Sequence, residues 1–211
     1  MRNRFEAASA IHHAVPKGNG GHEIVLDARD CFAFLARFGE VVRDSGWIVH
    51  ASCLMSTHHH AVVETPTPNL GEGLRRLQGG HARWFNARHR RSGNLFAQHC
   101  WSRRIVDDDW LRRACLYVVL NPVVAGLCEH PSQWRWSSFA TTAHGDPTRY
   151  VEGEDRLLRL FGGTPRESRR NYAGAIDRAV EIIQARRIQD GMTLWRALEP
   201  LTAPRSSSVS D

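Results

Sequence analysis

The chain has 211 residues, of which 42% are hydrophobic and 24% are charged, as in ordinary globular proteins. These values exclude a mostly disordered or fibrous chain, and the length suffices to bury a core without disulfides. Lys17 is the only lysine among 28 basic residues, and the net charge of +6 with a pI near 9.5 favours a polyanionic partner, although a GC-rich genome explains the arginine bias equally well.

The first predicted elements are a short strand over Ala10–Pro16 and a helix that begins near Ala28. Asp27 is a suitable N-cap for this helix, because its carboxylate can accept hydrogen bonds from the free N–H groups of the first turn. Apolar residues then recur at helical spacing as far as Gly46, which indicates the end of the helix.

Two β-rich stretches follow, over Trp47–Met55 and His59–Thr65, and they predict a pair of strands. Two prolines then break the chain. Asn69, with Glu72 three residues later, predicts a capped helix whose buried face extends to Phe85.

A further strand is expected at Trp101–Val106, and the acidic residues 107–109 then cap a third helix. This helix is expected to run to about Leu120. It should stop there because Pro122 disfavours helical geometry at Asn121.

The order strand, helix, strand, strand, helix, strand, helix predicts an α+β protein with a ferredoxin-like split βαβ core, an antiparallel sheet and an extra helix after the last strand. Beyond it, residues 141–151 are expected to be loop, and residues 157–161 a short apolar helix. Thr164, Pro165 and Glu167 then form a capping box that begins another helix. The predicted parts are therefore a domain over 8–141, a helical C-terminal extension over 150–199 and a flexible tail over 200–211.

Three consecutive histidines, His58, His59 and His60, are the first candidate site. Side chains alternate along a strand, so His58 and His60 share one face and can bind one divalent ion, whereas His59 faces the other way. The alternative is a polar turn that enters a strand.

Tyr117 and Asn121 are four residues apart and therefore lie on one face of the third helix. A tyrosine in an apolar helix is usually a core residue, and its phenol becomes a nucleophile only where the phenolate is stabilised. A nearby metal ion could do this, and so could Arg113 one turn earlier, unless Arg113 is simply a solvated charge.

The segment from residue 75 to residue 104 contains eight arginines, no acidic residue and several interleaved aromatic residues. Arginines follow a phosphate backbone and aromatic rings stack on exposed bases, so the segment favours nucleic-acid binding. The alternative is a solvated helix face. The predicted DNA-binding set is Arg75, Arg76, Arg83, Arg88, Arg90, Arg91, Arg103 and Arg104, with Arg113.

The five cysteines form no CxxC pair and lie in apolar contexts, so we expect reduced core residues of a cytoplasmic protein. The N-terminus has no apolar segment typical of a secretory signal. The longest stretch without Asp, Glu, Lys or Arg, Ser45–Val63, contains four histidines and would be a poor membrane span.

Several stretches resemble, in order, the REP-associated tyrosine transposases, which are single-tyrosine HUH endonucleases. These stretches are WIVHASCLMSTHHHAVVE, LRRLQGGHARWFNARHRRSGNLF, YVVLNPVVAGL and WRWSSF, and the likeness covers roughly residues 8–141. The sequence departs from the family pattern at His59, where a hydrophobic residue is usual, and at Ser56-Thr57, which replaces Pro-Asn.

The resemblance implies a nickase and strand transferase that cuts single-stranded DNA next to a hairpin. It implies metal ligation of Mg²⁺ or Mn²⁺ by His58, His60 and Asn121, and it implies that Tyr117 is the nucleophile that forms a 5′-phosphotyrosine link. A nucleoid-associated monomer or homodimer is then expected. The alternatives are a catalytically inactive nucleic-acid-binding protein on the same fold and a metalloenzyme that acts on a small molecule.

Overall fold

The computed structural model describes residues 9–147 and 153–202. Residues 8, 148–152 and 203–211, which belong to the predicted domain, loop, extension and tail, lie outside the described residues. The four described strands form one sheet in the order β2-β3-β1-β4, in which every neighbouring pair is antiparallel. The strands are β1 (Ala10–Val15), β2 (Ile48–Leu54), β3 (His59–Thr65) and β4 (Trp101–Ile105). This arrangement confirms the α+β, ferredoxin-like prediction.

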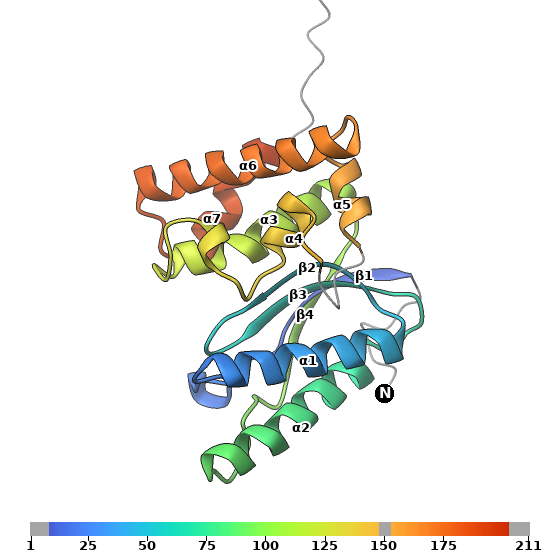
Figure 1. Ribbon diagram of the computed structural model, residues 1–211, viewed down its shortest axis with the longest axis vertical. Helices are drawn as coiled ribbons and strands as arrows, with labels where there is room; N and C mark the ends of the chain where they lie inside the picture. The colour runs from blue at the N-terminus through green and yellow to red at the C-terminus, as the bar shows by residue number, and fades with distance from the viewer. Residues whose placement is uncertain (1–8, 148–152, 203–211) are drawn as a thin grey trace, which may run out of the picture.

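Helices cover both faces of the sheet (Figure 1). One face carries α1 (Ala28–Ser45) and α2 (Leu70–His89), and the other carries α3 (Asp108–Val124) and the C-terminal helices. The buried apolar side chains accordingly form two clusters, one on each face. Because both faces are covered, β1, β2 and β3 are buried at almost every residue rather than at alternate ones.

The predicted limits of α1 are confirmed. The side chain of Asp27 accepts a hydrogen bond from the backbone N–H of Asp30, and Gly46 ends the helix with a φ of 65°. This left-handed conformation is one that glycine adopts without strain.

The predicted start of α2 after Asn69 is confirmed, but the predicted side-chain cap is wrong. Asn69 makes no capping hydrogen bond through its side chain, which instead accepts one from the indole N–H of Trp47 at 2.7 Å and donates one to the carbonyl oxygen of Ser45 at 2.9 Å. Trp47 is almost completely buried, so its N–H requires an acceptor. Asn69 therefore ties the start of α2 to the end of α1.

The helix α3 passes through Pro122 and ends at Val124, so the predicted end near Leu120 is also wrong. Pro122 lacks an N–H group and costs the helix one hydrogen bond. Pro122 and Val123 are buried among the apolar side chains on this face, and that burial offsets the lost bond. Asp107 caps the start of α3 as predicted, by accepting a hydrogen bond from the N–H of Trp110.

The C-terminal half contains more helix than predicted. A helix, α4 (Phe139–His144), occupies the start of the expected loop, since Phe139, Thr141 and Thr142 are buried there. The predicted short helix over residues 157–161 is found as α5 (Glu154–Arg159), which begins earlier and ends before Leu160. The predicted capping box is confirmed at the start of α6 (Pro165–Arg186), where Thr164 and Glu167 exchange hydrogen bonds.

Two short helices, α7 (Gly191–Ala197) and α8 (Glu199–Thr202), complete the described chain, so residues 200–202 are helical rather than the start of a flexible tail. Short 3₁₀ turns occur at Asn19–Gly21 and Pro131–Gln133. Within the described residues, no helix is long and apolar enough to cross a membrane.

The contact between α2 and Trp47 depends on a glycine and generates a stability prediction. A Cβ atom on Gly73 would lie 2.2 Å from the indole ring of Trp47. We expect Gly73→Ala to lower the free energy of unfolding by about 1–3 kcal/mol, because it overpacks a buried contact. Chemical denaturation measures this change.

Gly79→Ala in the same helix is the matched control. Its Cβ would meet only the flexible end of Arg83, at 3.5 Å, so the free energy of unfolding should stay the same or rise by up to about 1 kcal/mol. Equal losses in the two variants would contradict the proposed role of Gly73.

Candidate active site

Three histidines gather on the face of the sheet that α3 covers. His13 in β1 pairs opposite Val62, which makes His60 its diagonal neighbour on the same face. The ring centroids of His13 and His60 are 5.2 Å apart, and those of His58 and His60 are 4.7 Å apart. The structure therefore brings His58 and His60 together, and it adds His13.

His59 points to the opposite face, as strand alternation predicts. Its ring contacts Phe34 and Phe38 of α1, and its Nε2 atom forms a hydrogen bond of 2.8 Å with the hydroxyl of Ser52. The central histidine of the triplet is thus a core residue of the α1 and α2 side.

Hydrogen bonds orient the two candidate metal ligands. Nδ1 of His60 is joined to Nε2 of His13 at 3.0 Å, and Nδ1 of His58 is joined to the hydroxyl of Thr57 at 2.9 Å. No described residue forms a hydrogen bond with Nε2 of either ring. Histidine ligands of metals commonly have this arrangement, in which one nitrogen is held by a neighbour and the other is available.

Burial keeps these imidazoles neutral. It lowers the pKa of His13 and of His58 to about 4, with the charge of Lys17 contributing at His58. Burial also holds the pKa of His60 well below its usual value, and the neighbouring histidines add to this effect. A neutral imidazole has one N–H group and one lone pair. When Nδ1–H of His60 donates to Nε2 of His13, the lone pair of His13 is used and that of His60 lies on Nε2, where it is available to a metal.

Tyr117 projects from α3 toward the same histidines. Its ring centroid lies 5.7 Å from that of His60 and 5.8 Å from that of His13. Burial raises the pKa of its phenol, the nearby Asp190 raises it further, and Asn121 partly opposes the shift. The phenol is thus close to His60 but is protonated in this environment.

Asn121 lies one turn after Tyr117 and folds back along the helix. Its Nδ2 atom donates a hydrogen bond of 2.7 Å to the backbone carbonyl of Tyr117. Among the described residues, no group donates a hydrogen bond to its amide oxygen, the atom that a hard cation prefers. No cluster of three or more His, Cys, Asp or Glu side chains in the described part of the chain could hold a metal, so the candidate donors are two imidazoles and one amide.

A cavity of about 400 Å³ opens beside the ring of Tyr117. His13 and His60 line it together with Tyr117, and α7 contributes a wall through Gly191. A Cβ atom on Gly191 would lie 2.4 Å from the hydroxyl oxygen of Tyr117, so only glycine allows the chain to pass this close. Neither His13 nor α7 was among the predicted site residues.

The predicted DNA-binding arginines do not form one surface. Arg103 lines the cavity beside Tyr117, and its guanidinium lies 4.3 Å from the ring centroid of Trp110. Arg104 is the next residue of β4, and its charge contributes to the lowered pKa of His12. Arg113 does not reach the phenol, because it stacks on Trp195 at 5.3 Å and pairs with an acidic residue of α8.

The segment itself contains no acidic residue, but two of its arginines have counter-charges from elsewhere in the chain. Arg88 pairs with Asp27 and with the fully buried Asp30, and Arg76 pairs with Asp44 at 2.6 Å. These acids belong to α1 and its N-cap, and the fold brings them to α2. Arg88 is therefore a tether between the two helices.

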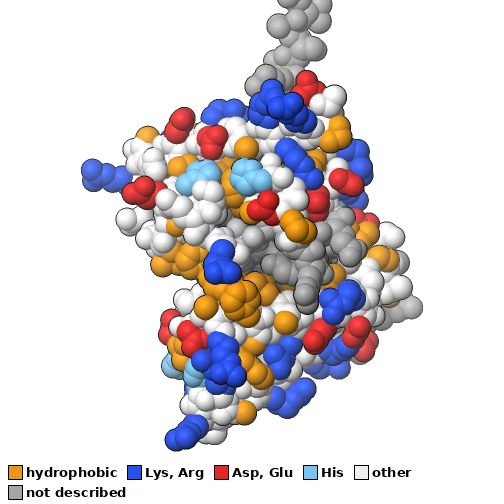
Figure 2. All heavy atoms as spheres, viewed as in Figure 1, with side chains coloured by type: hydrophobic (Ala, Val, Ile, Leu, Met, Phe, Trp, Pro, Cys, Tyr) orange, Lys and Arg blue, Asp and Glu red, His pale blue; other side chains and the backbone are white. Residues whose placement is uncertain are grey.

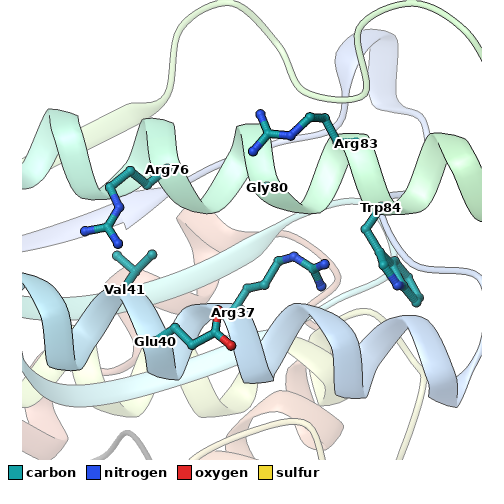
Figure 3. Close-up of a pocket in the computed structure, with 7 residues that line it drawn as sticks. All are labelled: Arg37, Glu40, Val41, Arg76, Gly80, Arg83 and Trp84. Carbon is teal, nitrogen blue, oxygen red and sulfur yellow. The ribbon is translucent and has the colours of Figure 1, made fainter.

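The remaining arginines of α2 and its C-terminal end are exposed; they are Arg75, Arg83, Arg90 and Arg91. Figure 3 shows Arg83 beside a groove between α1 and α2, into which Arg37 of α1 also reaches. The groove lies on the face of the sheet opposite Tyr117. On the face shown in Figure 2, Lys and Arg side chains are spread over both helical layers with acidic ones among them.

Comparison with solved structures gives a match in fold. No family model and no curated protein matches the sequence. A solved structure of a REP-associated tyrosine transposase bound to a REP hairpin matches 72% of this chain and 91% of its own, with a TM-score of 0.60 and 16% identity. The chain has the fold of that transposase.

A second match is more distant. It is a candidate transposase from Deinococcus radiodurans R1, with a TM-score of 0.40, 15% identity, and coverage of 51% of this chain and 87% of its own. This likeness is too weak to support any conclusion.

The pairing of Arg88 leads to a prediction that separates structural from surface arginines. We expect Arg88→Ala to lower the free energy of unfolding, because it removes a partner from the buried carboxylate of Asp30. Arg83→Ala, at an exposed position of the same helix, should change it by less than about 0.5 kcal/mol. Equal denaturation midpoints for the two variants would contradict the tether.

Proposed function

We propose that the protein is a tyrosine transposase: a metal-dependent endonuclease and strand transferase that cuts single-stranded DNA next to a hairpin. The observation that carries this proposal is the meeting of the Tyr117 ring with His60 and His13, at 5.7 and 5.8 Å, beside an open cavity. The likeness in fold to a transposase bound to a REP hairpin supports DNA as the partner.

A divalent cation fits the residues present. His58 and His60 would hold it through their Nε2 atoms and Asn121 through its amide oxygen, which is the mixed nitrogen and oxygen donor set that suits Mg²⁺ or Mn²⁺. When bound, such a cation polarises the scissile phosphate and lowers the energy of a nearby phenolate.

The residues of the chain supply the remaining chemistry. The Tyr117 phenol gives up its proton to water as its oxygen attacks phosphorus, the bond from phosphorus to the 3′ oxygen breaks, and this oxygen leaves as a 3′-hydroxyl after it takes up a proton from water. The 5′ end is then esterified to Tyr117. Because the ester keeps the energy of the phosphodiester bond, attack by a second 3′-hydroxyl can join DNA without ATP.

Positive side chains near the phenol favour the phosphate backbone. Arg103 and Lys17 line the same cavity as Tyr117, so they can bind the phosphates that flank the scissile bond. The exposed arginines of α2 lie on the other face, where they are candidates for the hairpin.

Tyr117→Phe tests the nucleophile. It keeps the ring contacts but removes the attacking oxygen, so a labelled hairpin oligonucleotide should no longer become covalently attached to the protein in Mg²⁺ or Mn²⁺, while its binding is largely retained. Mass spectrometry detects the adduct. Tyr172→Phe is the control, because this buried phenol belongs to α6 and its loss should leave the adduct in place. A persistent adduct in Tyr117→Phe would show that another group attacks.

His13 is expected to act as a positioning residue, because it holds His60 through a hydrogen bond. His13→Ala should raise the metal concentration that gives half-maximal adduct about 10–100-fold, and His13→Gln should restore part of the loss. His12→Gln, at the adjacent position on the opposite face, should leave the metal requirement unchanged. An unaltered metal requirement in His13→Ala would remove His13 from the site.

A non-catalytic nucleic-acid-binding protein on the same fold is the second candidate. It is favoured by the burial of the Tyr117 phenol and by the close approach of Gly191 to its oxygen. This candidate predicts DNA binding that weakens steeply with salt and yields no covalent adduct with either metal.

A further inference from the structure

The cavity beside Tyr117 has aromatic walls that none of the roles above explains. Three tryptophans line it, and they come from three separate elements: Trp101 from β4, Trp110 from α3 and Trp195 from α7. Met192 of α7 adds to this apolar lining. Trp101 is 49% exposed and Met192 is 64% exposed, so both meet solvent although large apolar side chains are usually buried.

Two of these indole rings already have partners. The guanidinium of Arg103 lies over the ring of Trp110, and that of Arg113 lies over the ring of Trp195. The two indole rings contact each other edge to face, at a centroid distance of 6.3 Å. Trp101 differs from them. Its ring contacts that of His13, at 5.2 Å and nearly perpendicular, and among the described residues no ring lies parallel to its face and no guanidinium lies over it.

The charge of the cavity also points to a nucleic acid. Lys17 and Arg103 line it, and none of the described lining residues is acidic. Its volume of about 400 Å³ lies within the range of sites that bind small organic groups. An aromatic surface beside cations is the combination that binds a base together with its phosphate in single-stranded DNA.

We propose that this cavity holds one unpaired nucleobase of the DNA strand, next to the scissile phosphate and stacked on the indole of Trp101. Met192 and Trp195 form the other wall, so the C-terminal extension is part of the DNA-binding site. The base beside the bond to be cut would then set the position of the backbone relative to Tyr117. This inference rests on the proposed function, but its test does not require cleavage.

The experiment compares two single-stranded probes of equal length and charge, measured in EDTA so that no strand is cut. One is a homopolymer of thymidine, and the other is the same backbone with abasic sites throughout. The wild-type protein should bind the thymidine probe roughly 5- to 150-fold more tightly, since stacking contributes about 1–3 kcal/mol per base.

Trp101→Ala should remove most of this preference while leaving the affinity for the abasic probe unchanged, and Trp101→Phe should restore much of it. The matched control is Phe32→Ala, which removes an aromatic side chain of similar exposure, 53%, from α1 on the other face of the sheet. The preference should survive in this control. Met192→Ala should give a smaller loss than Trp101→Ala, because a thioether covers less of a base than an indole does.

Two results would overturn the inference: a wild-type protein that binds both probes equally, or a base preference that Trp101→Ala leaves intact. Adduct formation with Mg²⁺ or Mn²⁺ is measured separately. An absent adduct together with a Trp101-dependent base preference would reject the nuclease and retain the nucleobase site. An adduct without that base preference would retain the nuclease and reject the nucleobase site.

Discussion

The arrangement of the candidate site follows from a sheet that is buried on both faces. Successive side chains of β1 and β3 must enter different layers, so His59 packs against Phe34 and Phe38 while His60 meets Tyr117. A shift of one residue in the β1–β3 register would place His59 in the site and remove His60 and its contact with His13. The antiparallel pairing of β1 with β3 is therefore the constraint on which the other distances depend.

Local signals in the sequence predicted much of the fold. The N-cap at Asp27, the glycine at position 46 and the capping box at Thr164 act over a few residues, and each was found where expected. Strand alternation predicted the directions of His58, His59 and His60 for the same reason. The position of Tyr117 near His60 was expected only from the resemblance to a family, because no local signal relates a helix at residue 117 to a strand at residue 60.

The features that were missed depend on contacts between distant segments. His13 is separated in sequence from His60 by 47 residues. The side chain of Asn69 accepts a hydrogen bond from the indole of Trp47 rather than from the first turn of its own helix. Pro122 stays helical because its surroundings are buried, and Arg88 is neutralised by acids from α1. In each case a tertiary partner outweighs the local preference, and neither periodicity nor composition identifies such partners.

The C-terminal helices affect the site because they share its core. Leu116 and Val119 of α3 belong to the same buried cluster as Ile176 of α6 and Leu194 of α7. The helix that carries Tyr117 and the helix that carries Gly191 are thus held by one set of contacts, whereas the division into residues 8–141 and 150–199 remains a prediction. Removal of the extension would expose apolar side chains of α3 and alter the setting of Tyr117. The binding and activity of a truncated chain would therefore reflect a damaged core. Single substitutions at the wall of the cavity separate the role of α7 in binding from its role in folding.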